Sequence, residues 1–352
     1  MRRVLVTGGS GFIGSNFLRH WTKAHPEDQV VNLDLLTYAG NPQNLADIED
    51  KPGYTFVHGD ICDRSLVDDI FARYEIDSVV HFAAESHVDR SILGPEAFVQ
   101  TNVQGTFTLL ETARQAWATD TSCRFVHVST DEVYGSLGPK DPPFSESSRY
   151  MPNSPYSASK AGSDHFVRAY HHTFGLPAII TNCSNNYGPY QYPEKLIPLC
   201  IINSLFGQEI PVYGDGQNVR DWLHVFDHCQ ALDLILQKGV PGGQYTIGGE
   251  NEWTNVDIIR RILDIVDAED PREGSSQDLI RFVRDRPGHD RRYAMNASRL
   301  RRELGWSPEY DFDAGLQQTV HWYLHNREWW EPLRNAAYDQ YYARQYGSNS
   351  QS

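Results

Sequence analysis

Two adjacent carboxylates, Asp131 and Glu132, follow a strand-like run and a threonine, Thr130. Close like charges push the pKa values of two carboxyl groups apart, so that one can donate a proton while the other is an ionised base. Such a pair can move two protons in one complex. The alternative is structural, with Asp131 as a helix cap and Glu132 as a solvated side chain. These residues alone leave both interpretations open.

A glycine-rich segment near the start fits the dinucleotide-binding fingerprint in two registers, which begin at Gly8 or Gly9 and share Gly11 and Gly14. Glycines permit a tight turn and let backbone N–H groups approach a pyrophosphate at a helix N-terminus. Asp34 stands twenty residues beyond Gly14. An acid there accepts hydrogen bonds from the adenosine ribose and repels a 2′-phosphate, which favours NAD over NADP. A plain glycine-rich turn is the alternative.

A second pair, Tyr156 and Lys160, follows Ser154 and Pro155. Ser is a common helix N-cap and Pro suits the first helical position, so we expect a helix that carries the pair on one face. An unperturbed phenol, with a pKa of roughly 10, is a poor base at neutral pH. A nearby ammonium and a positive nicotinamide would lower that pKa. The pattern predicts Tyr156 as a base for a sugar or alcohol hydroxyl; a Tyr/Lys pair on an ordinary exposed helix is the alternative.

Alternating apolar runs and helical stretches must position these groups. We expect strands at residues 4–6, 29–33, 55–58, 78–82, 124–129 and 178–182. We expect helices at residues 13–23, 98–116, 155–170, 255–267 and 316–325. The alternation predicts an α/β fold, a Rossmann-type doubly wound parallel sheet. After about residue 185, Pro, Gly and Tyr become frequent, and we expect a smaller C-terminal α/β substrate domain there.

The composition fits a folded, acidic protein. Of 352 residues, 40% are hydrophobic and 12% aromatic, enough for one large domain or two fused ones. The 46 acidic and 31 basic residues give a net charge of -15, which disfavours nucleic acid and anionic membranes as partners. The first residues lead into a strand without the apolar core of a signal peptide, and no long uncharged span follows, so we expect no membrane segment.

The cysteines and histidines predict neither disulfides nor a metal site. The five Cys are scattered, without a C-x-x-C pair, which is typical of reduced thiols in a cytoplasmic protein. His87, His224 and His289 lack tight ligand spacing, and no Cys or carboxylate cluster accompanies them, so we expect no metal.

Several motifs together resemble the extended short-chain dehydrogenase/reductase family: TGGSGFIG, HFAAES, Asp34 and Tyr156-x-x-x-Lys160. That family includes epimerases, dehydratases, decarboxylases and reductases. Longer strings are similar to those of its dTDP-glucose 4,6-dehydratase branch: DLLTYAGN (34–41), HFAAESHVDRSI (81–92), STDEVYG (129–135), SPYSASKA (154–161), TNCSNNYGPYQYPEKLIP (181–198), RDWLHV (220–225) and DRPGHDRRYAM (285–295). The resemblance implies an NAD-dependent hydro-lyase of deoxysugar biosynthesis. A dehydratase or epimerase of another nucleotide sugar, such as UDP-glucose, and a non-catalytic NAD sensor are the alternatives.

The resemblance also implies a role for each catalytic candidate. Tyr156, supported by Lys160, takes the proton of the C4 hydroxyl, and Thr130 hydrogen-bonds the C4 oxygen. Glu132 removes the C5 proton, and protonated Asp131 gives its proton to the C6 hydroxyl, which leaves as water. An epimerase or reductase needs no such carboxyl pair, and a sensor has no reason to keep all five groups.

The predicted cofactor site combines the fingerprint with residues carried over from the family. Its residues are Gly8, Gly11, Phe12, Ile13, Gly14, Asp34, Leu35, Leu36, Thr37, Asp60, Ile61, Phe82, Ala83, Ala84, Glu85, Ser86, Thr101, Tyr156, Lys160 and Asn186. Asp60 and Ile61 follow the third strand, where they could bracket the adenine; a helix cap at Asp60 is the alternative.

The predicted nucleotide-sugar site rests mainly on the longer strings. Its residues are Ser86, Thr130, Asn185, Lys195, Leu196, Pro211, Val212, Tyr213, Arg220, Asn255, Asp285, Arg286, Pro287, Gly288 and His289. Arg220 is the best candidate for a diphosphate clamp, because guanidinium forks match phosphate oxygens.

The resemblance implies a division of the chain and an assembly. We expect an NAD-binding Rossmann domain at residues 1–185, a nucleotide-sugar-binding domain at 186–335 with some chain interleaving, and a C-terminal tail at 336–352. The helices at 98–116 and 155–170 are apolar on more than one face. In the family the corresponding helices pair as a four-helix bundle, so we expect a homodimer.

Overall fold

The computed structural model describes residues 1–118, 120–271 and 273–346, and a seven-stranded parallel sheet is its largest feature. The strands are β1 (Arg3–Thr7), β2 (Gln29–Asp34), β3 (Tyr54–His58), β4 (Ser78–His81), β5 (Arg124–Thr130), β6 (Ala178–Cys183) and β10 (Gln244–Ile247). Their order is β10-β6-β5-β4-β1-β2-β3. The chain order reverses between β1 and β4, and open α/β sheets bind ligands at such a point.

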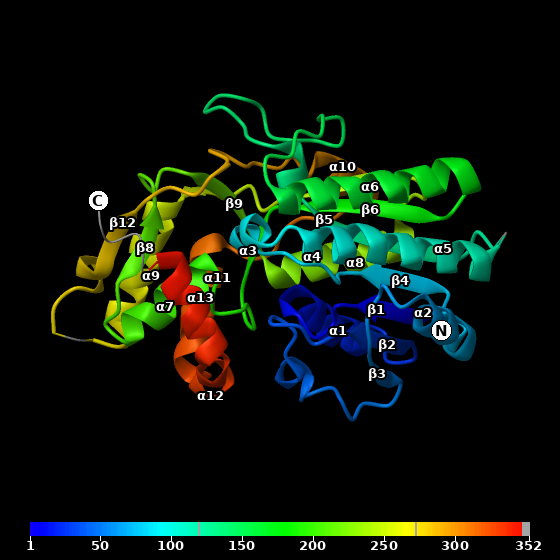
Figure 1. Ribbon diagram of the computed structural model, residues 1–352, viewed down its shortest axis with the longest axis horizontal. Helices are drawn as coiled ribbons and strands as arrows, with labels where there is room; N and C mark the ends of the chain where they lie inside the picture. Colours follow the sequence, from blue (N-terminus) through cyan, green and yellow to red (C-terminus); the bar gives the residue numbers. More distant parts are fainter. Residues whose placement is uncertain (119, 272, 347–352) are drawn as a thin grey trace.

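Helices cover both faces of this sheet (Figure 1). On one face lie α1 (Phe12–Ala24) and α8 (Val225–Lys238); on the other lie α2 (Arg64–Tyr74), α5 (Thr106–Trp117) and α6 (Pro155–Phe174). Val79 and Val80 are neighbours in β4, yet each belongs to a different apolar core, because successive side chains of a strand point to opposite faces. The uninterrupted apolar runs of these strands are typical of a sheet buried on both sides.

The second part of the chain builds a smaller unit beside the carboxyl ends of the strands. It contains a three-stranded sheet of β7 (Asn185–Tyr187), β9 (Val219–His224) and β11 (Glu252–Thr254), and a two-stranded sheet of β8 (Ile210–Tyr213) and β12 (Ile280–Val283). Around them pack α7 (Leu196–Leu205), α9 (Asn255–Glu269) and α11 (Phe312–His325), which share a third apolar core. This unit lies at the left of Figure 1.

The expected α/β fold, doubly wound sheet and smaller C-terminal unit are confirmed. The chain is interleaved, because α8 and β10 come from the second part but complete the large sheet and its cover. The short elements α10 (Ser298–Leu304) and α12 (Arg327–Trp330) lie near the end. Of the predicted tail at 336–352, residues Ala336–Tyr346 form helix α13, and 347–352 lie outside the described residues.

The expected continuous helix at 98–116 is wrong in one respect. After α3 (Val88–Leu93) and α4 (Glu96–Phe98), a π-helical segment, Val99–Gly105, precedes α5. The Asn102 side chain bonds both the backbone N–H and the carbonyl of Glu85, and also the Ser159 hydroxyl. These tertiary bonds anchor the segment to the loop after β4, and π-bulges are frequent at functional sites.

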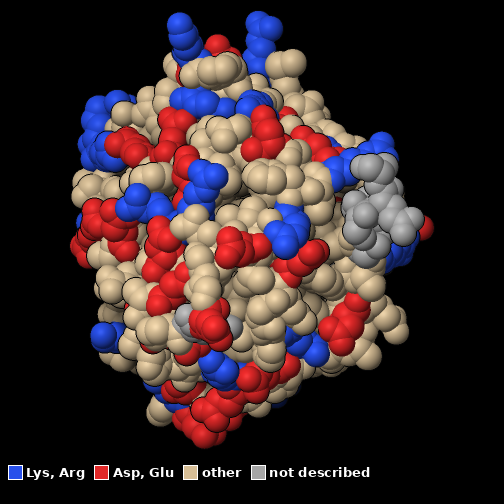
Figure 2. All heavy atoms as spheres, turned by 90° about the vertical axis from the view of Figure 1, so that its left-hand side faces the viewer, with Lys and Arg blue, Asp and Glu red and all other residues tan. Residues whose placement is uncertain are grey.

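The surface carries charges of both signs, and the cysteines are unpaired. On the face drawn in Figure 2, basic side chains are interspersed with acidic ones. All five cysteines are free thiols, four of them buried. Within the described residues, no helix is both long and apolar enough to cross a membrane.

Candidate active site

A cavity of about 330 Å³ opens at the carboxyl ends of the strands, where the chain order reverses. Gly8, Gly11 and Gly14 line it, which selects the Gly8 register of the fingerprint. Gly8 has φ +72°, and a Cβ there would lie 2.6 Å from the Ala83 nitrogen, so only glycine fits this turn. Gly9 instead packs against Leu18 and Asn32. The glycines thus leave a backbone cradle at the start of α1, which fits a dinucleotide pyrophosphate.

Asp34 ends β2 inside the same cavity. Its Oδ2 accepts a hydrogen bond from the Ser10 N–H at 2.9 Å, and its Oδ1 accepts one from the Leu36 N–H at 2.8 Å. Burial raises the pKa of this carboxyl, and both backbone bonds oppose that rise. The carboxyl is therefore fixed at the strand end, facing the space beside the glycine cradle.

The carboxyl pair lies on a short 3₁₀ helix, Asp131–Tyr134, that follows β5 directly. Thr130 is its N-cap, because the Thr130 hydroxyl accepts the Glu132 N–H at 3.2 Å. Asp131 is therefore not the cap, and with 1% exposure it is buried. The structural alternative of a capping Asp131 and a solvated Glu132 is wrong, since both carboxyls face the cavity.

The two carboxyls have different environments. The pKa of Asp131 is raised well above its usual value, first by burial and then by the charge of Glu132. Burial also raises the pKa of Glu132, but the cations Arg286, Arg220 and Lys195 oppose that rise. Among the described residues, Asp131 Oδ2 is buried without a hydrogen-bond partner. Asp131 is thus suited to be a neutral proton donor, and Glu132 to be the ionised base.

Tyr156 and Lys160 lie on α6, which begins as expected with Ser154 as N-cap and Pro155 at the first position. Lys160 Nζ donates to the Val128 carbonyl at 2.9 Å, and both side chains of the pair are buried in the cavity wall. The expected lowering of the Tyr156 pKa is not found in the protein alone. Burial holds the pKa of Tyr156 well above its usual value, and the carboxylate of Glu132 adds to this. A positive group bound beside the phenol is therefore needed to lower it.

A second cavity of about 190 Å³ adjoins the first. Ser86, Glu132, Asn185, Asn186, Gln191, Glu194 and Lys195 line both. Arg220 is buried in the second cavity, where its Nη1 donates to the Val219 carbonyl and its Nη2 to the Asp290 carbonyl. Arg286 also lines it, 3.6 Å from Asp89 Oδ1. Two guanidinium groups beside a slot that opens onto Glu132 form a suitable site for an anionic ligand.

The structure brings most of the predicted site residues together. Every predicted cofactor residue except Leu36 lines the first cavity, together with the five catalytic candidates. The predicted substrate residues line one or both cavities except Asp285, Pro287 and Gly288. Leu36 has a positive φ of 53°. It contributes to the cavity only indirectly, because its N–H donates to the Asp34 carboxyl. Asp285 instead accepts a hydrogen bond from His289 Nδ1 at 2.7 Å, so it supports a lining residue.

Other residues that line the cavities were not predicted. In the first they are Leu33, Tyr38, Ala39, Gly40, Gly59, Val128, Ser129, Cys183, Ser184, Gln191, Tyr192 and Glu194; in the second they include His87, Val88, Asp89, Ile197, Trp222, Ile259, Tyr293 and Tyr346. Most of them lie within the strings that carried the prediction, and that position was the only signal for them. Tyr346 ends α13 and had no such signal. The described residues hold no group of three or more His, Cys, Asp and Glu that could bind a metal ion.

A family model with the description GDP-mannose 4,6 dehydratase matches residues 5–319, which include every lining residue of the two cavities except Tyr346. The chain belongs to this family. The chain is 53% identical over 347 residues to a dTDP-glucose 4,6-dehydratase of Neisseria meningitidis serogroup B. The match covers 96% of this chain and 98% of that protein. The expected membership of the extended short-chain dehydrogenases/reductases is confirmed.

Solved structures of relatives in this family have the same fold. One is a dTDP-glucose 4,6-dehydratase of Streptomyces venezuelae with NAD bound, at 52% identity and a TM-score of 0.88, covering 94% of this chain and 99% of that one. Another is a dTDP-glucose 4,6-dehydratase of Bacillus anthracis in complex with NAD, at 47% identity and a TM-score of 0.86, covering 95% and 100%.

Proposed function

We propose that the chain is a dTDP-glucose 4,6-dehydratase, which converts dTDP-D-glucose to dTDP-4-keto-6-deoxy-D-glucose and water. The observation that carries this proposal is the Asp131–Glu132 pair, whose two carboxyls have different charges around them and face a cavity shared with Thr130 and Tyr156. Removal of water across C5 and C6 needs one acid and one base in the same complex. Relatives with that activity at about half identity support the choice of substrate.

The glycine cradle and Asp34 are suited to hold NAD. When bound, NAD would supply the acceptor for the C4 hydride and the donor of the same hydride to C6, so that none would be consumed. Asp34 is positioned to accept hydrogen bonds from the adenosine ribose, and its charge disfavours a 2′-phosphate. The loop at residues 82–86 and Thr101 of the π-helical segment line the same cavity, together with the catalytic side chains.

The chain's own residues move the protons. Tyr156 takes the proton of the C4 hydroxyl, and the Lys160 ammonium stabilises the resulting phenolate. Thr130 hydrogen-bonds the C4 oxygen. The C4 ketone acidifies C5–H, Glu132 removes that proton, and Asp131 gives its proton to the C6 hydroxyl as the C6–O bond breaks and water leaves. A proton then returns to C5 as hydride reaches C6, which completes the 4-keto-6-deoxy sugar.

The second cavity is the proposed seat of the nucleoside diphosphate, with Arg220 as a phosphate clamp. Replacement of Arg220 by Lys retains the positive charge near Glu132 but removes the planar fork. We expect KM for dTDP-glucose to rise about tenfold, the equivalent of ~1.4 kcal/mol, with kcat within about twofold. Initial rates over a range of substrate concentrations measure both constants. Arg291→Lys is the matched control, because Arg291 is a half-exposed partner of Asp215 outside both cavities. An unchanged KM for Arg220→Lys would remove Arg220 from the clamp.

Mass spectrometry of products tests the proposed function. The protein is incubated separately with dTDP-glucose and UDP-glucose. Loss of one water from dTDP-glucose, without net consumption of added NAD, is the expected result. Loss of water from UDP-glucose instead would keep the mechanism and overturn the substrate. No water loss from either would contradict the dehydratase and favour a sensor or another nucleotide sugar.

We also propose a homodimer formed by α5 and α6. The π-helical segment before α5 exposes Val99 at 60%, and α6 exposes Phe166 and Phe174 at 40% and 51%. Large exposed apolar side chains that gather on adjacent helices are typical of an interface. The four helices of two copies then form a bundle. The free thiols favour the cytoplasm as its location.

A single substitution tests the dimer. Phe166→Glu places a charge in the middle of the proposed interface, so we expect light scattering to show the mass of one chain where the unmodified protein shows two. Phe282→Glu is the control, because Phe282 is 58% exposed on β12, remote from α6. A monomeric unmodified protein at micromolar concentration, or a dimeric Phe166→Glu variant, would count against this interface.

Finally, we propose the division of labour along the chain that the cavities suggest. Residues 1–185 hold the cofactor, 186–335 hold most of the nucleotide-sugar site, and the tail from 336 adds Tyr346 to its wall.

A further inference from the structure

Helix α6 carries a third polar residue on the face of Tyr156 and Lys160. Asp164 follows Lys160 by four residues, which places both side chains on one side of the helix. Asp164 is 1% exposed and Lys160 is 4% exposed. Proteins generally bury a charged side chain this deeply only where a second group compensates its charge. The two residues are therefore candidates for a buried pair behind the catalytic tyrosine.

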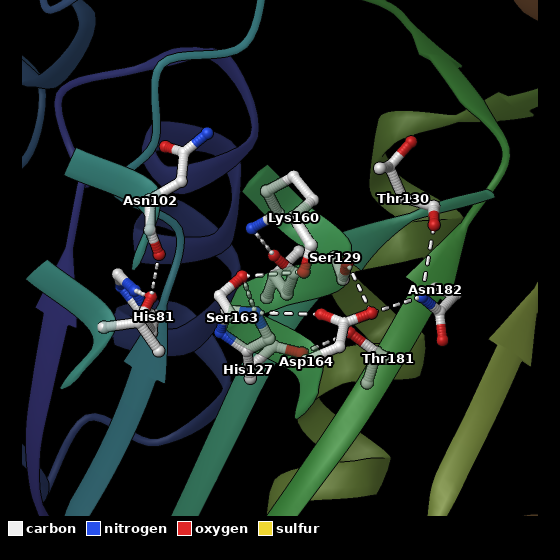
Figure 3. A network of polar contacts seen from close by, with 12 residues as sticks. His81, Asn102, His127, Ser129, Thr130, Lys160, Ser163, Asp164, Thr181 and Asn182 are labelled. Carbon is white, nitrogen blue, oxygen red and sulfur yellow. Dashed lines mark hydrogen bonds and ion pairs between the residues drawn. The ribbon is translucent and has the colours of Figure 1, made fainter. Parts of the chain in front are cut away.

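The Asp164 carboxyl is held by donors from three segments. Its Oδ2 accepts hydrogen bonds from Ser129 Oγ at 3.0 Å, Tyr150 Oη at 2.8 Å and Asn182 Nδ2 at 3.1 Å. Asn182 Nδ2 also donates to the Thr130 backbone carbonyl at 3.1 Å. Figure 3 shows this carboxyl between β5 and β6, with Ser129, Asn182 and His127 directed at it. The carboxyl thus connects α6 to the strand end that leads into Asp131 and Glu132.

The other titratable groups around Lys160 are neutral. His127 Nε2 lies 3.1 Å from Asp164 Oδ1, and burial, followed by the charge of Lys160, lowers the pKa of His127. Burial likewise holds the pKa of His81 on β4 well below its usual value. Burial raises the pKa of the Cys183 thiol on β6 to about 12. Among these groups, Asp164 is the acidic side chain whose charge raises the pKa of Lys160.

Lys160 needs that anion because of where it lies. Its Nζ donates to the Val128 carbonyl, and burial lowers the pKa of Lys160 to about 8, a fall that the charge of Asp164 opposes. The ammonium can stabilise a Tyr156 phenolate only while it is protonated. Without Asp164, a larger share of Lys160 would be neutral at the pH at which the enzyme works.

We propose that Asp164 is a positioning residue for the Tyr156–Lys160 pair, whose buried carboxylate is the fixed counter-charge that keeps the Lys160 ammonium protonated and seated on the Val128 carbonyl. It acts through Lys160 and touches neither cavity. The catalytic consequence of this inference rests on the proposed role of Tyr156 and Lys160 in C4 oxidation, but the electrostatic relation between Asp164 and Lys160 does not.

The first test does not depend on activity. Lysine side chains labelled with ¹³C at Cε are titrated by NMR, and Lys160→Arg assigns the Lys160 signal by its disappearance. We expect the pKa of Lys160 to be lower in Asp164→Asn than in the unmodified protein by about one unit or more. Ser129→Ala and Tyr150→Phe are matched controls, because each removes one donor to the carboxyl and leaves its charge; both should leave the Lys160 pKa nearly unchanged. Equal pKa values in Asp164→Asn and the unmodified protein would overturn the proposal.

The second test concerns catalysis and is made in the Glu132→Gln background, where C5 chemistry is removed. Oxidation at C4 should decline as pH rises through the pKa of Lys160, and Asp164→Asn should move this decline to lower pH by about one unit or more. In Lys160→Arg the decline should vanish, because guanidinium stays protonated. A uniform loss of rate in Asp164→Asn, without a shift, would indicate a merely structural residue. If no sugar is oxidised by the parent variant, the proposed function fails, and the NMR titration still decides the relation of Asp164 to Lys160.

Discussion

Replacement of Glu132 by Gln is expected to stop exchange of the C5 hydrogen with solvent while oxidation at C4 persists. The amide has nearly the same shape, but it cannot remove a proton. We expect overall turnover to fall by about 10²–10⁴, the usual contribution of a general base. Reactions in D₂O followed by mass spectrometry measure deuterium at C5. Quenched mixtures should contain a sugar that is lighter by the two hydrogens removed in oxidation.

The position of Glu132 makes this result specific. It lines both cavities, and the charges of Arg286, Arg220 and Lys195 favour its ionised form. Glu252→Gln is the control, since Glu252 forms an ion pair with Arg292 away from the cavities. Normal C5 exchange in Glu132→Gln would give the base role to another group.

Replacement of Asp131 by Asn is expected to give the opposite pattern. Exchange at C5 should continue, because Glu132 and Tyr156 are intact, whereas loss of water should fall by about 10²–10⁴ since the C6 hydroxyl has lost its acid. Substrate should therefore acquire deuterium at C5 in D₂O without forming the deoxy product. Asp141→Asn is the control, because Asp141 is exposed on a surface loop, where its carboxyl accepts the Gly138 N–H. Loss of C5 exchange together with dehydration would show that the two carboxyls do not act separately.

The acid role of Asp131 also fixes the sign of a pH effect. Burial and the charge of Glu132 raise the pKa of Asp131, so its acid form persists to higher pH than that of an ordinary aspartate and is lost as pH rises through that raised pKa. Dehydration should therefore decline at alkaline pH. Because Lys160 gives oxidation an alkaline decline of its own, the pH profile of dehydration is to be compared with that of oxidation alone in Glu132→Gln.

The parts of the site that lie on local patterns could be predicted from the sequence. The Gly8 turn, Asp34 at a strand end and the Ser154–Pro155 helix start each depend on a few neighbouring residues, and the structure places them as expected. The carboxyl pair could be recognised in the sequence because it directly follows a strand-like run. Its capping alternative could be rejected only when Thr130 was seen to cap the turn.

The remaining features depend on contacts between distant segments. The short strand β10 has little apolar pattern of its own and joins the large sheet only by pairing with β6. The π-helical segment follows from the bonds of Asn102 to Glu85, which no local pattern shows. The raised pKa of Tyr156 is likewise a result of burial by the whole fold. No local sequence pattern marks Asp164. Its proposed role depends on hydrogen bonds from Ser129, Tyr150 and Asn182, which lie in other segments of the chain.

The fate of the C4 hydrogen tests the central claim most directly. The protein is incubated in ordinary water with dTDP-glucose that carries deuterium at C4, and the product is analysed by NMR and mass spectrometry. The account predicts that the deuterium is found at C6 of dTDP-4-keto-6-deoxyglucose. Deuterium that stays at C4, returns there with inversion, or is lost to solvent or to released cofactor would contradict a 4,6-dehydratase.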